Sequence, residues 1–356
     1  MRKLLKAVML SAVIFSSVGA QTWDCGKTKW KVTATLSEGT LTIKGIGPMR
    51  GRECEVECSP LPWDESGKSI TNVVIENGVT SIGEGAFSST SLKTVTIPKS
   101  VKSIGSGAFG WGAYGVKLVS IDVAAGNANY SSENGILFNN DRTTLLIYPA
   151  GKTGTSYAIP NSVKSIGENA FARCTVLTSV AIPNGVTSIP YGAFEGCTGL
   201  TSVSIGNSVK SIEADAFLGC VSLKSVTIPN SVEVIEGGND YNTGGAFAGC
   251  EGLTSITFGN SVKSIGSEAF RACSGLKSVT LPKSIEYVGL QAFAACTGLT
   301  SVTVLNPVPP KPGEHIFDNE KDMTKVCLYV PSGRISAYRA AEGWNQFSCV
   351  KEAESR

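Results

Sequence analysis

The fold is decided by residues 193–205, Ala-Phe-Glu-Gly-Cys-Thr-Gly-Leu-Thr-Ser-Val-Ser-Ile, because close copies of this stretch recur along most of the chain. Ser208-Val209-Lys210-Ser211-Ile212 follows, and Ala216-Phe217 then opens the next copy, 23 residues after the first. The Ala-Phe pair occurs eight times, at Phe87, Phe109, Phe171, Phe194, Phe217, Phe247, Phe270 and Phe293. Self-similarity at a fixed period of this length is the signature of a solenoid.

Each repeat carries apolar residues at spacings that bring them to one side. The runs of the type Leu-x-x-Val-x-Ile, as at 200–205, end in the period-two alternation of a β-strand with β-branched residues. The second half, Val-x-x-Ile, turns two more apolar residues inward. The sequence therefore predicts a β-rich solenoid with turns of about 23 residues, in which the Phe side chains stack into one continuous column.

Six repeats place a cysteine three residues after the Phe: Cys174, Cys197, Cys220, Cys250, Cys273 and Cys296. A column of redox-active or metal-binding thiols is one interpretation. However, these positions are in phase with the inward residues, and free cysteine behaves as a small buried hydrophobe. Parallel side chains on neighbouring turns also have poor geometry for a disulfide. We therefore expect six inert, buried thiols.

The first twenty residues have a basic start, an apolar run from Leu4 to Phe15 and the small-residue exit Val18-Gly19-Ala20. This pattern predicts a secretory signal peptide, residues 1–20, cleaved after Ala20, since the apolar run is too short to span a bilayer. No second hydrophobic span follows, so we expect a secreted, periplasmic or surface protein without stable membrane insertion. Its cysteines would meet oxidising conditions.

The charge balance argues against nucleic acid as a partner. The whole chain has 31 basic and 29 acidic residues, and loss of Arg2, Lys3 and Lys6 with the leader would leave 28 and 29. A net charge of about −1 offers no field of one sign to hold nucleic acid or an anionic membrane.

Residues 21–69 have the pattern of an N-terminal β cap. Short alternating runs at 32–36 and 40–44 suggest a hairpin, and Trp63 is one of three tryptophans that could cover the first turn. We expect a disulfide between Cys25 and either Cys54 or Cys58. Zinc is the alternative, but no fourth ligand stands nearby.

After the solenoid, which we place at residues 70–305, the pattern decays into a C-terminal cap, 306–356. Ser332 could cap a short helix from 333 to 341. Trp344 and Phe347 would cover the last turn, and a disulfide between Cys327 and Cys349 is expected to close the cap.

Three places break the period. The interval from 118 to 160 predicts one enlarged turn from which a hairpin rises. Two shorter insertions supply aromatic and acidic candidates for ligand binding, namely Trp111, Tyr114, Asp240 and Tyr241. Insertions in repeat proteins map to loops, often on a binding face. Tolerated surface variation is the alternative.

The residues between the inward positions would form the outer face of the sheet. Candidate ligand-binding residues there are Thr201, Ser202, Lys224, Thr254 and Lys277, and their columns continue at Ser204, Ser225, Thr227, Ser255, Thr257, Ser278 and Thr280. Columns of hydroxyls can meet an extended glycan or protein backbone through many weak contacts. Alternatively, Ser and Thr are there only because they suit exposed strands.

No catalytic constellation is evident. The one histidine, His315, stands in a proline-rich segment, and no Gly-x-Ser-x-Gly turn presents a nucleophile. Gly67-Lys68-Ser69 and Gly151-Lys152-Thr153 lack the glycine that a phosphate-binding loop needs. We predict no enzyme activity, no cofactor and no metal.

The motif Ala-Phe-x-x-Cys-x-x-Leu-x-x-Val-x-Ile-Pro-x-x-Val-x-x-Ile-Gly resembles the BspA-like leucine-rich repeats of bacterial surface and secreted proteins. The resemblance covers about residues 70–305, and residues 330–344 are similar to the family's C-terminal caps. It implies a leucine-rich-repeat solenoid with a parallel sheet on one face, capped at both ends, and a role in adhesion or recognition of host matrix or glycans. The family shares no catalytic residues.

The leading hypothesis is an exported recognition protein that binds a protein or polysaccharide through the sheet face or the inserted loops. The alternative is a structural component of a surface layer that assembles with copies of itself. The sequence does not fix the oligomeric state.

Overall fold

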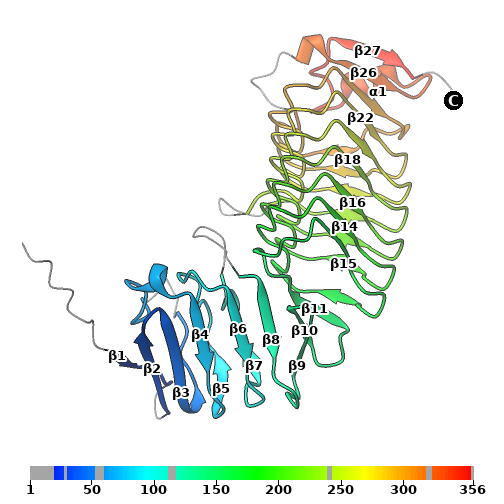
Figure 1. Ribbon diagram of the computed structural model, residues 1–356. Coiled ribbons are helices and arrows are strands. Elements are labelled where there is room, and N and C mark those ends of the chain that lie inside the picture. Colours follow the sequence, from blue (N-terminus) through cyan, green and yellow to red (C-terminus); the bar gives the residue numbers. More distant parts are fainter. Residues whose placement is uncertain are drawn as a thin grey trace, which may run out of the picture.

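The computed structural model describes residues 20–27, 30–52, 60–110, 118–238, 243–317 and 323–353. It confirms a solenoid whose turns stack parallel strands (Figure 1). The first row holds the longer strands: β4 (Asn72–Ile75), β6 (Thr94–Ile97), β8 (Ser120–Val123), β12 (Ser156–Ala158), β14 (Ser179–Ala181), β16 (Ser202–Ser204), β18 (Ser225–Thr227), β20 (Ser255–Thr257), β22 (Ser278–Leu281), β24 (Ser301–Val304), β26 (Cys327–Val330) and β27 (Cys349–Glu352).

A second row of short parallel strands arises from the Val-x-x-Ile half of each repeat. It contains β5 (Val79–Ile82), β7 (Ser103–Ile104), β13 (Ser165–Ile166), β15 (Ser188–Ile189), β17 (Ser211–Ile212), β19 (Val234–Ile235), β21 (Ser264–Ile265), β23 (Tyr287–Val288) and β25 (Lys311–Pro312). The expected sheet on one face is thus accompanied by a narrower one, because the isoleucine of each Val-x-x-Ile segment pairs in register with that of the next turn, as Ile189 does with Ile212.

The Ala-Phe segments form the third side of each turn. The Phe N–H donates to the Ala carbonyl of the following turn, as from Phe194 to Ala216 (2.8 Å) and from Phe217 to Ala246 (2.7 Å). The rings are buried and stack with centroids 4.9–5.7 Å apart from Phe171 to Phe317. The predicted Phe column is therefore present from Phe171 onward, and a backbone ladder runs beside it. It is not the single column that we expected, because Phe87 and Phe109 stack on each other in the separate N-terminal core.

The six cysteines of the repeats are buried free thiols, as predicted. Five of them donate Sγ–H to the carbonyl of the Phe in the preceding turn: Cys197, Cys220, Cys250, Cys273 and Cys296, at 3.0–3.4 Å. In the first repeat that carries a cysteine, Cys174 lies 3.7 Å from the carbonyl oxygen of Tyr148. Burial raises the pKa of the Cys250 thiol to about 12, so the reactive thiolate is suppressed.

The enlarged turn contains β9 (Tyr130–Glu133), β10 (Ile136–Asn139) and β11 (Thr144–Ile147). The predicted hairpin of β10 and β11 exists, but it does not rise out of the turn. β10 pairs antiparallel with both β9 and β11, and β11 joins the second row through β13. Ile136 and Phe138 pack in the C-terminal core, whereas Leu137 packs in the N-terminal core. This strand is a partition, buried on both faces.

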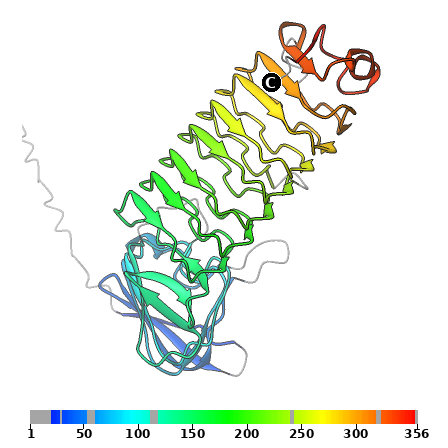
Figure 2. The ribbon, with the colours of Figure 1, turned by 90° about the vertical axis from the view of Figure 1, so that its right-hand side faces the viewer.

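The solenoid changes direction at this partition. In Figure 1 the N-terminal strands β1 to β8 lie side by side along one axis, and the turns beyond β11 stack along another. Figure 2 looks along the first axis, so the N-terminal turns overlap while the C-terminal turns form an open ladder. An antiparallel hairpin in place of parallel strands interrupts both rows and accounts for the corner.

The N-terminal cap is built from β1 (Gln21–Asp24), β2 (Lys31–Ser37) and β3 (Thr40–Pro48), which pair antiparallel and include the predicted hairpin. β3 then pairs parallel with β4, so the cap and the repeats share one sheet. A short 3-10 helix, η1 (Gly67–Ser69), precedes β4. Trp63 is fully buried and stacks on Phe87 with centroids 6.2 Å apart, closing the aromatic column.

The expected disulfide from Cys25 is not found, because Cys25 is a free thiol in the structure. Its side chain is fully buried, and its N–H donates to the Val32 carbonyl. Burial, followed by the charge of Asp24, raises the pKa of the thiol to about 12. Cys54 and Cys58 lie outside the described residues.

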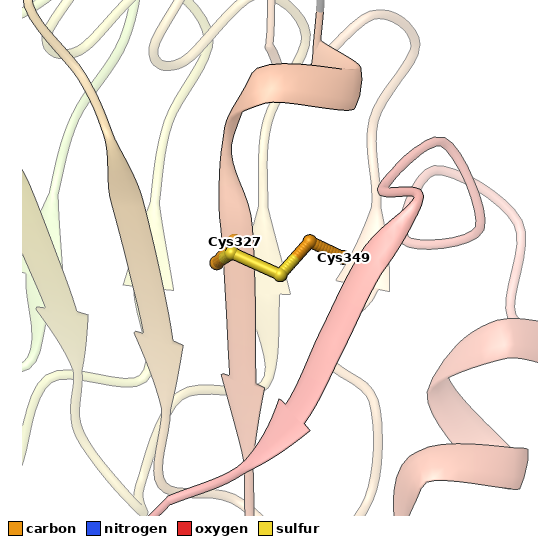
Figure 3. Close-up of a disulfide and its surroundings, with 2 residues drawn as sticks. All are labelled: Cys327 and Cys349. Carbon is orange, nitrogen blue, oxygen red and sulfur yellow. A yellow bond between two sulfur atoms is a disulfide. The ribbon is translucent and has the colours of Figure 1, made fainter.

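The C-terminal cap consists of η2 (Met323–Lys325), β26, α1 (Ile335–Ala340) and β27. Cys327 and Cys349 form the expected disulfide between register partners on these two parallel strands (Figure 3). Side chains on neighbouring parallel strands can therefore be bridged, contrary to the geometric expectation applied to the repeat thiols. Trp344 and Phe347 both pack edge-on against Phe317 and cover the last turn. Ser332 is not the helix cap that we expected, because its hydroxyl donates to the Glu352 carboxylate and α1 begins after Arg334.

Replacing Phe217 with Ala should lower the free energy of unfolding by about 3–5 kcal/mol, because the cavity would stand between two stacked rings. Val221→Ala is the control, since this side chain is exposed and its loss should cost about 0.5 kcal/mol or less. Urea unfolding followed by circular dichroism measures both. Equal effects would contradict a continuous Phe column.

Alkylation with iodoacetamide and mass spectrometry should find the repeat cysteines unmodified in the native protein and alkylated in urea without reductant. Cys25 should behave in the same way, because it is a buried free thiol. Cys327 and Cys349 should resist alkylation in urea until a reductant is added. Native labelling of Cys220 at the unfolded rate would show that the column is accessible.

Candidate binding surface

The outward side of the first row carries hydroxyl groups in columns that the strand register aligns. Ser179 and Ser202 are register partners, as are Ser225 and Ser255. Adjacent strands lie about 4.7–4.9 Å apart, so each column repeats at this interval along the solenoid. The alignment follows from the repeat length, because one inserted residue would turn every side chain to the other face.

The threonine hydroxyls of one column donate hydrogen bonds to backbone carbonyls of the preceding turn. Thr201 Oγ1 donates to the Thr178 carbonyl (2.9 Å), and Thr254 Oγ1 donates to the Lys224 carbonyl (3.0 Å). Thr178 and Thr300 make the same bond to the preceding turn. Thr201 and Thr254, two of the expected ligand contacts, therefore donate their hydroxyl protons to the backbone and can offer a ligand only acceptor oxygens.

The next two columns face solvent. We name the following eight residues of β16, β18, β20 and β22 the hydroxyl face: Ser202, Ser204, Ser225, Thr227, Ser255, Thr257, Ser278 and Thr280. All eight are exposed, and within the described chain their hydroxyls make no hydrogen bond to the protein. The two columns are about 6.7 Å apart, which is two residues along a strand. Of the sequence-selected residues, Ser202 belongs to this face.

Lys224 and Lys277 flank the hydroxyl face, two turns apart, with Thr254 between them. Both are exposed, and neither forms an ion pair with a described carboxylate. Each ammonium group lies over a glycine of the following turn: a Cβ at Gly252 would be 3.4 Å from Lys224 Nζ, and one at Gly298 would be 3.3 Å from Lys277 Nζ. In the sequence, the space for each lysine side chain is marked by a glycine directly before the leucine of the repeat, Gly252 before Leu253 and Gly298 before Leu299.

The remaining loop candidates, Trp111, Tyr114, Asp240 and Tyr241, lie outside the described residues. Their flanking residues show where each insertion leaves the solenoid. Gly110 follows the buried Phe109 on the Phe side, and Gly238 follows β19 of the second row.

The second row carries paired charges in contrast. Glu233 accepts from Lys263 (2.8 Å) and lies 3.9 Å from Lys210, which links three successive turns. The Lys263 ammonium hydrogen-bonds the Glu233 carboxylate, and this lowers the carboxyl pKa and raises the lysine pKa. This column satisfies its own charges, unlike Lys224 and Lys277.

Within the described ranges, no group of three or more His, Cys, Asp and Glu side chains is arranged to hold a metal ion. A search of the same residues for a membrane-spanning helix, one both long and apolar enough, finds none.

Comparison with one known structure supports the fold, and two further structures are similar in part. The pneumococcal vaccine antigen PcpA is 19% identical, with 93% of this chain and 98% of that chain covered at a TM-score of 0.52. A leucine-rich cell surface protein of Faecalibacterium prausnitzii is 28% identical, with 67% of this chain and 54% of that chain covered at a TM-score of 0.49. A leucine-rich repeat protein of Eubacterium ventriosum is 24% identical, with 75% of this chain and 92% of that chain covered at a TM-score of 0.44. No curated protein matches the sequence.

Six copies of the BspA type leucine-rich repeat region match residues 65–140, 150–244 and 241–338, which together make up most of the chain. The matched residues contain the Phe column, the thiol column and most of both rows of strands. The chain therefore belongs to the BspA-type leucine-rich repeat family.

Proposed function

We propose that the protein is an exported, non-catalytic recognition protein that binds an extended protein or glycan through the hydroxyl face. The observation that carries the proposal is the difference between neighbouring columns. Thr201 and its equivalents donate their protons to the backbone, whereas the eight residues of the hydroxyl face keep donors and acceptors free in solvent.

The surface fits a polymer better than a small molecule. Successive strands present the same pair of side chains, so a ligand with its own repeating hydroxyl, amide or carbonyl groups can make one weak contact per turn. Such contacts add because they are linked in one chain. Lys224 and Lys277 add a mild preference for ligands that carry some carboxylate or sulfate.

Export agrees with the disulfide. Cys327–Cys349 is the kind of bond that persists in oxidising compartments, and the leader-like residues 1–20 would direct the chain there. Trp111, Tyr114, Asp240 and Tyr241 remain candidates for a second contact, separate from the hydroxyl face.

Ser255→Arg should weaken binding at least about tenfold, because the long cation would cover hydroxyls on the neighbouring strands. Ser162→Arg is the control, since Ser162 is exposed on a turn outside both rows. A screen of immobilised glycans and matrix proteins supplies the ligand, and surface plasmon resonance measures the dissociation constants. Parallel measurements on Trp111→Ala and Tyr241→Ala test the inserted loops.

The proposal would be wrong if a saturable ligand bound Ser255→Arg and the wild type with equal affinity. Loss of binding only in the Trp111 or Tyr241 variants would move the site to the insertions.

A further inference from the structure

The first sheet of the chain and the last sheet of the first row each end in a strand that has one strand neighbour among the described residues. β1 stands at the N-terminal end and pairs with β2, and β27 stands at the C-terminal end and pairs with β26. β1 is antiparallel to β2, β2 is antiparallel to β3, and β3 is parallel to β4. Two reversals restore the direction, so β1 runs in the same sense as the first-row strands, to which β27 belongs.

The free backbone groups of the two strands are in matching phase. Cys25 N–H donates to Val32 on β2, so by the alternation of strands Trp23 also faces β2, and Thr22 and Asp24 point their N–H and C=O groups away. Ala353 N–H donates to Val330 on β26, so Lys351 faces β26, and Val350 and Glu352 point outward. Each edge therefore offers donors and acceptors at every second residue.

The burial of Trp23 and Val350 is compatible with a parallel pairing of β1 and β27 in this phase. Trp23 lies on the core side of β1 and is only partly buried against the N-terminal core. Val350 lies on the core side of β27 and is 8% exposed. In a parallel pair, one partner faces the neighbouring strand with its backbone and the other faces away, while both side chains point to the same side. Trp23 opposite Val350 meets both conditions.

This register also places Asp24 opposite Lys351. Both side chains are exposed. The Asp24 carboxylate accepts one bond, from Gly26 N–H, and Lys351 has no ion pair with a described residue. Opposite charges directly across neighbouring strands stabilise pairing. The disulfide between Cys349 and Cys327 holds β27 against the sheet, so that its edge stays formed.

We propose that β27 of one copy pairs in parallel with β1 of a second copy, in the register that sets Trp23 opposite Val350 and Asp24 opposite Lys351. The contact is head to tail and uses different surfaces on the two copies, so it extends into an open chain. It would continue the first row from one copy to the next. The inference does not depend on the ligand of the hydroxyl face.

Sedimentation velocity over a range of protein concentrations tests the contact, using the chain exported through its own leader and checked by mass spectrometry for a mature N-terminus at Gln21. The wild type should form species that grow with concentration. Asp24→Lys and Lys351→Glu should each weaken association at least about tenfold, because each sets like charges opposite one another. An equimolar mixture of the two variants should associate again. In the mixture, Asp24 of one variant meets Lys351 of the other, and the two substituted positions also carry opposite charges.

Lys283→Glu is the matched control: it makes the same charge change as Lys351→Glu at an exposed lysine far from both edges, and it should associate like the wild type. Circular dichroism confirms that each variant is folded. A wild type that stays monomeric at all concentrations would overturn the proposal. So would association that both edge variants retain, or variants that fail to recover on mixing.

Discussion

The structure depends on one constraint: within each of the two cores, a turn must place its aromatic side chain directly over that of the turn before. The N–H of a Phe donates to the Ala carbonyl of the following turn, as in Phe194 to Ala216, and five of the repeat thiols donate to the Phe carbonyl of the preceding turn, as Cys220 does to Phe194. The side of the turn that lacks strands therefore has its own ladder. Because this ladder and the two rows of strands share one period, a turn of about 23 residues leaves few backbone groups unpaired.

The same period separates scaffold from surface. The Phe, Cys, Leu, Val and Ile side chains of the repeat point inward. The threonines of one column donate their hydroxyl protons to backbone carbonyls, as Thr201 does. The hydroxyl face remains, and its side-chain hydroxyls make no hydrogen bond to the described part of the protein. The terminal strands β1 and β27 differ from the strands between them, because each presents backbone N–H and C=O groups as well as side chains at its edge.

Periodicity revealed the fold because it reports burial directly, and it placed the Phe and Cys columns and the closing aromatic residues correctly. It could not reveal the corner. Ile136, Leu137 and Phe138 form a short apolar run, which does not say that alternate residues enter two different cores. Hydrogen-bond partners were equally hidden: Thr201 and Ser202 are both exposed hydroxyl residues, and only the structure shows that one donates to a carbonyl while the other does not. Cys25 was expected in a disulfide because cysteine counting ignores burial.

Amide hydrogen exchange measures the central constraint most directly. The N–H groups of Phe194, Phe217, Phe247 and Phe270 belong to segments without regular strands, yet each donates to the next turn. We predict that they exchange as slowly as the amides of β14 to β22, because opening one requires separating two turns. Exchange at the rate of an exposed loop, with the strands still protected, would contradict a third ladder and the account built on it.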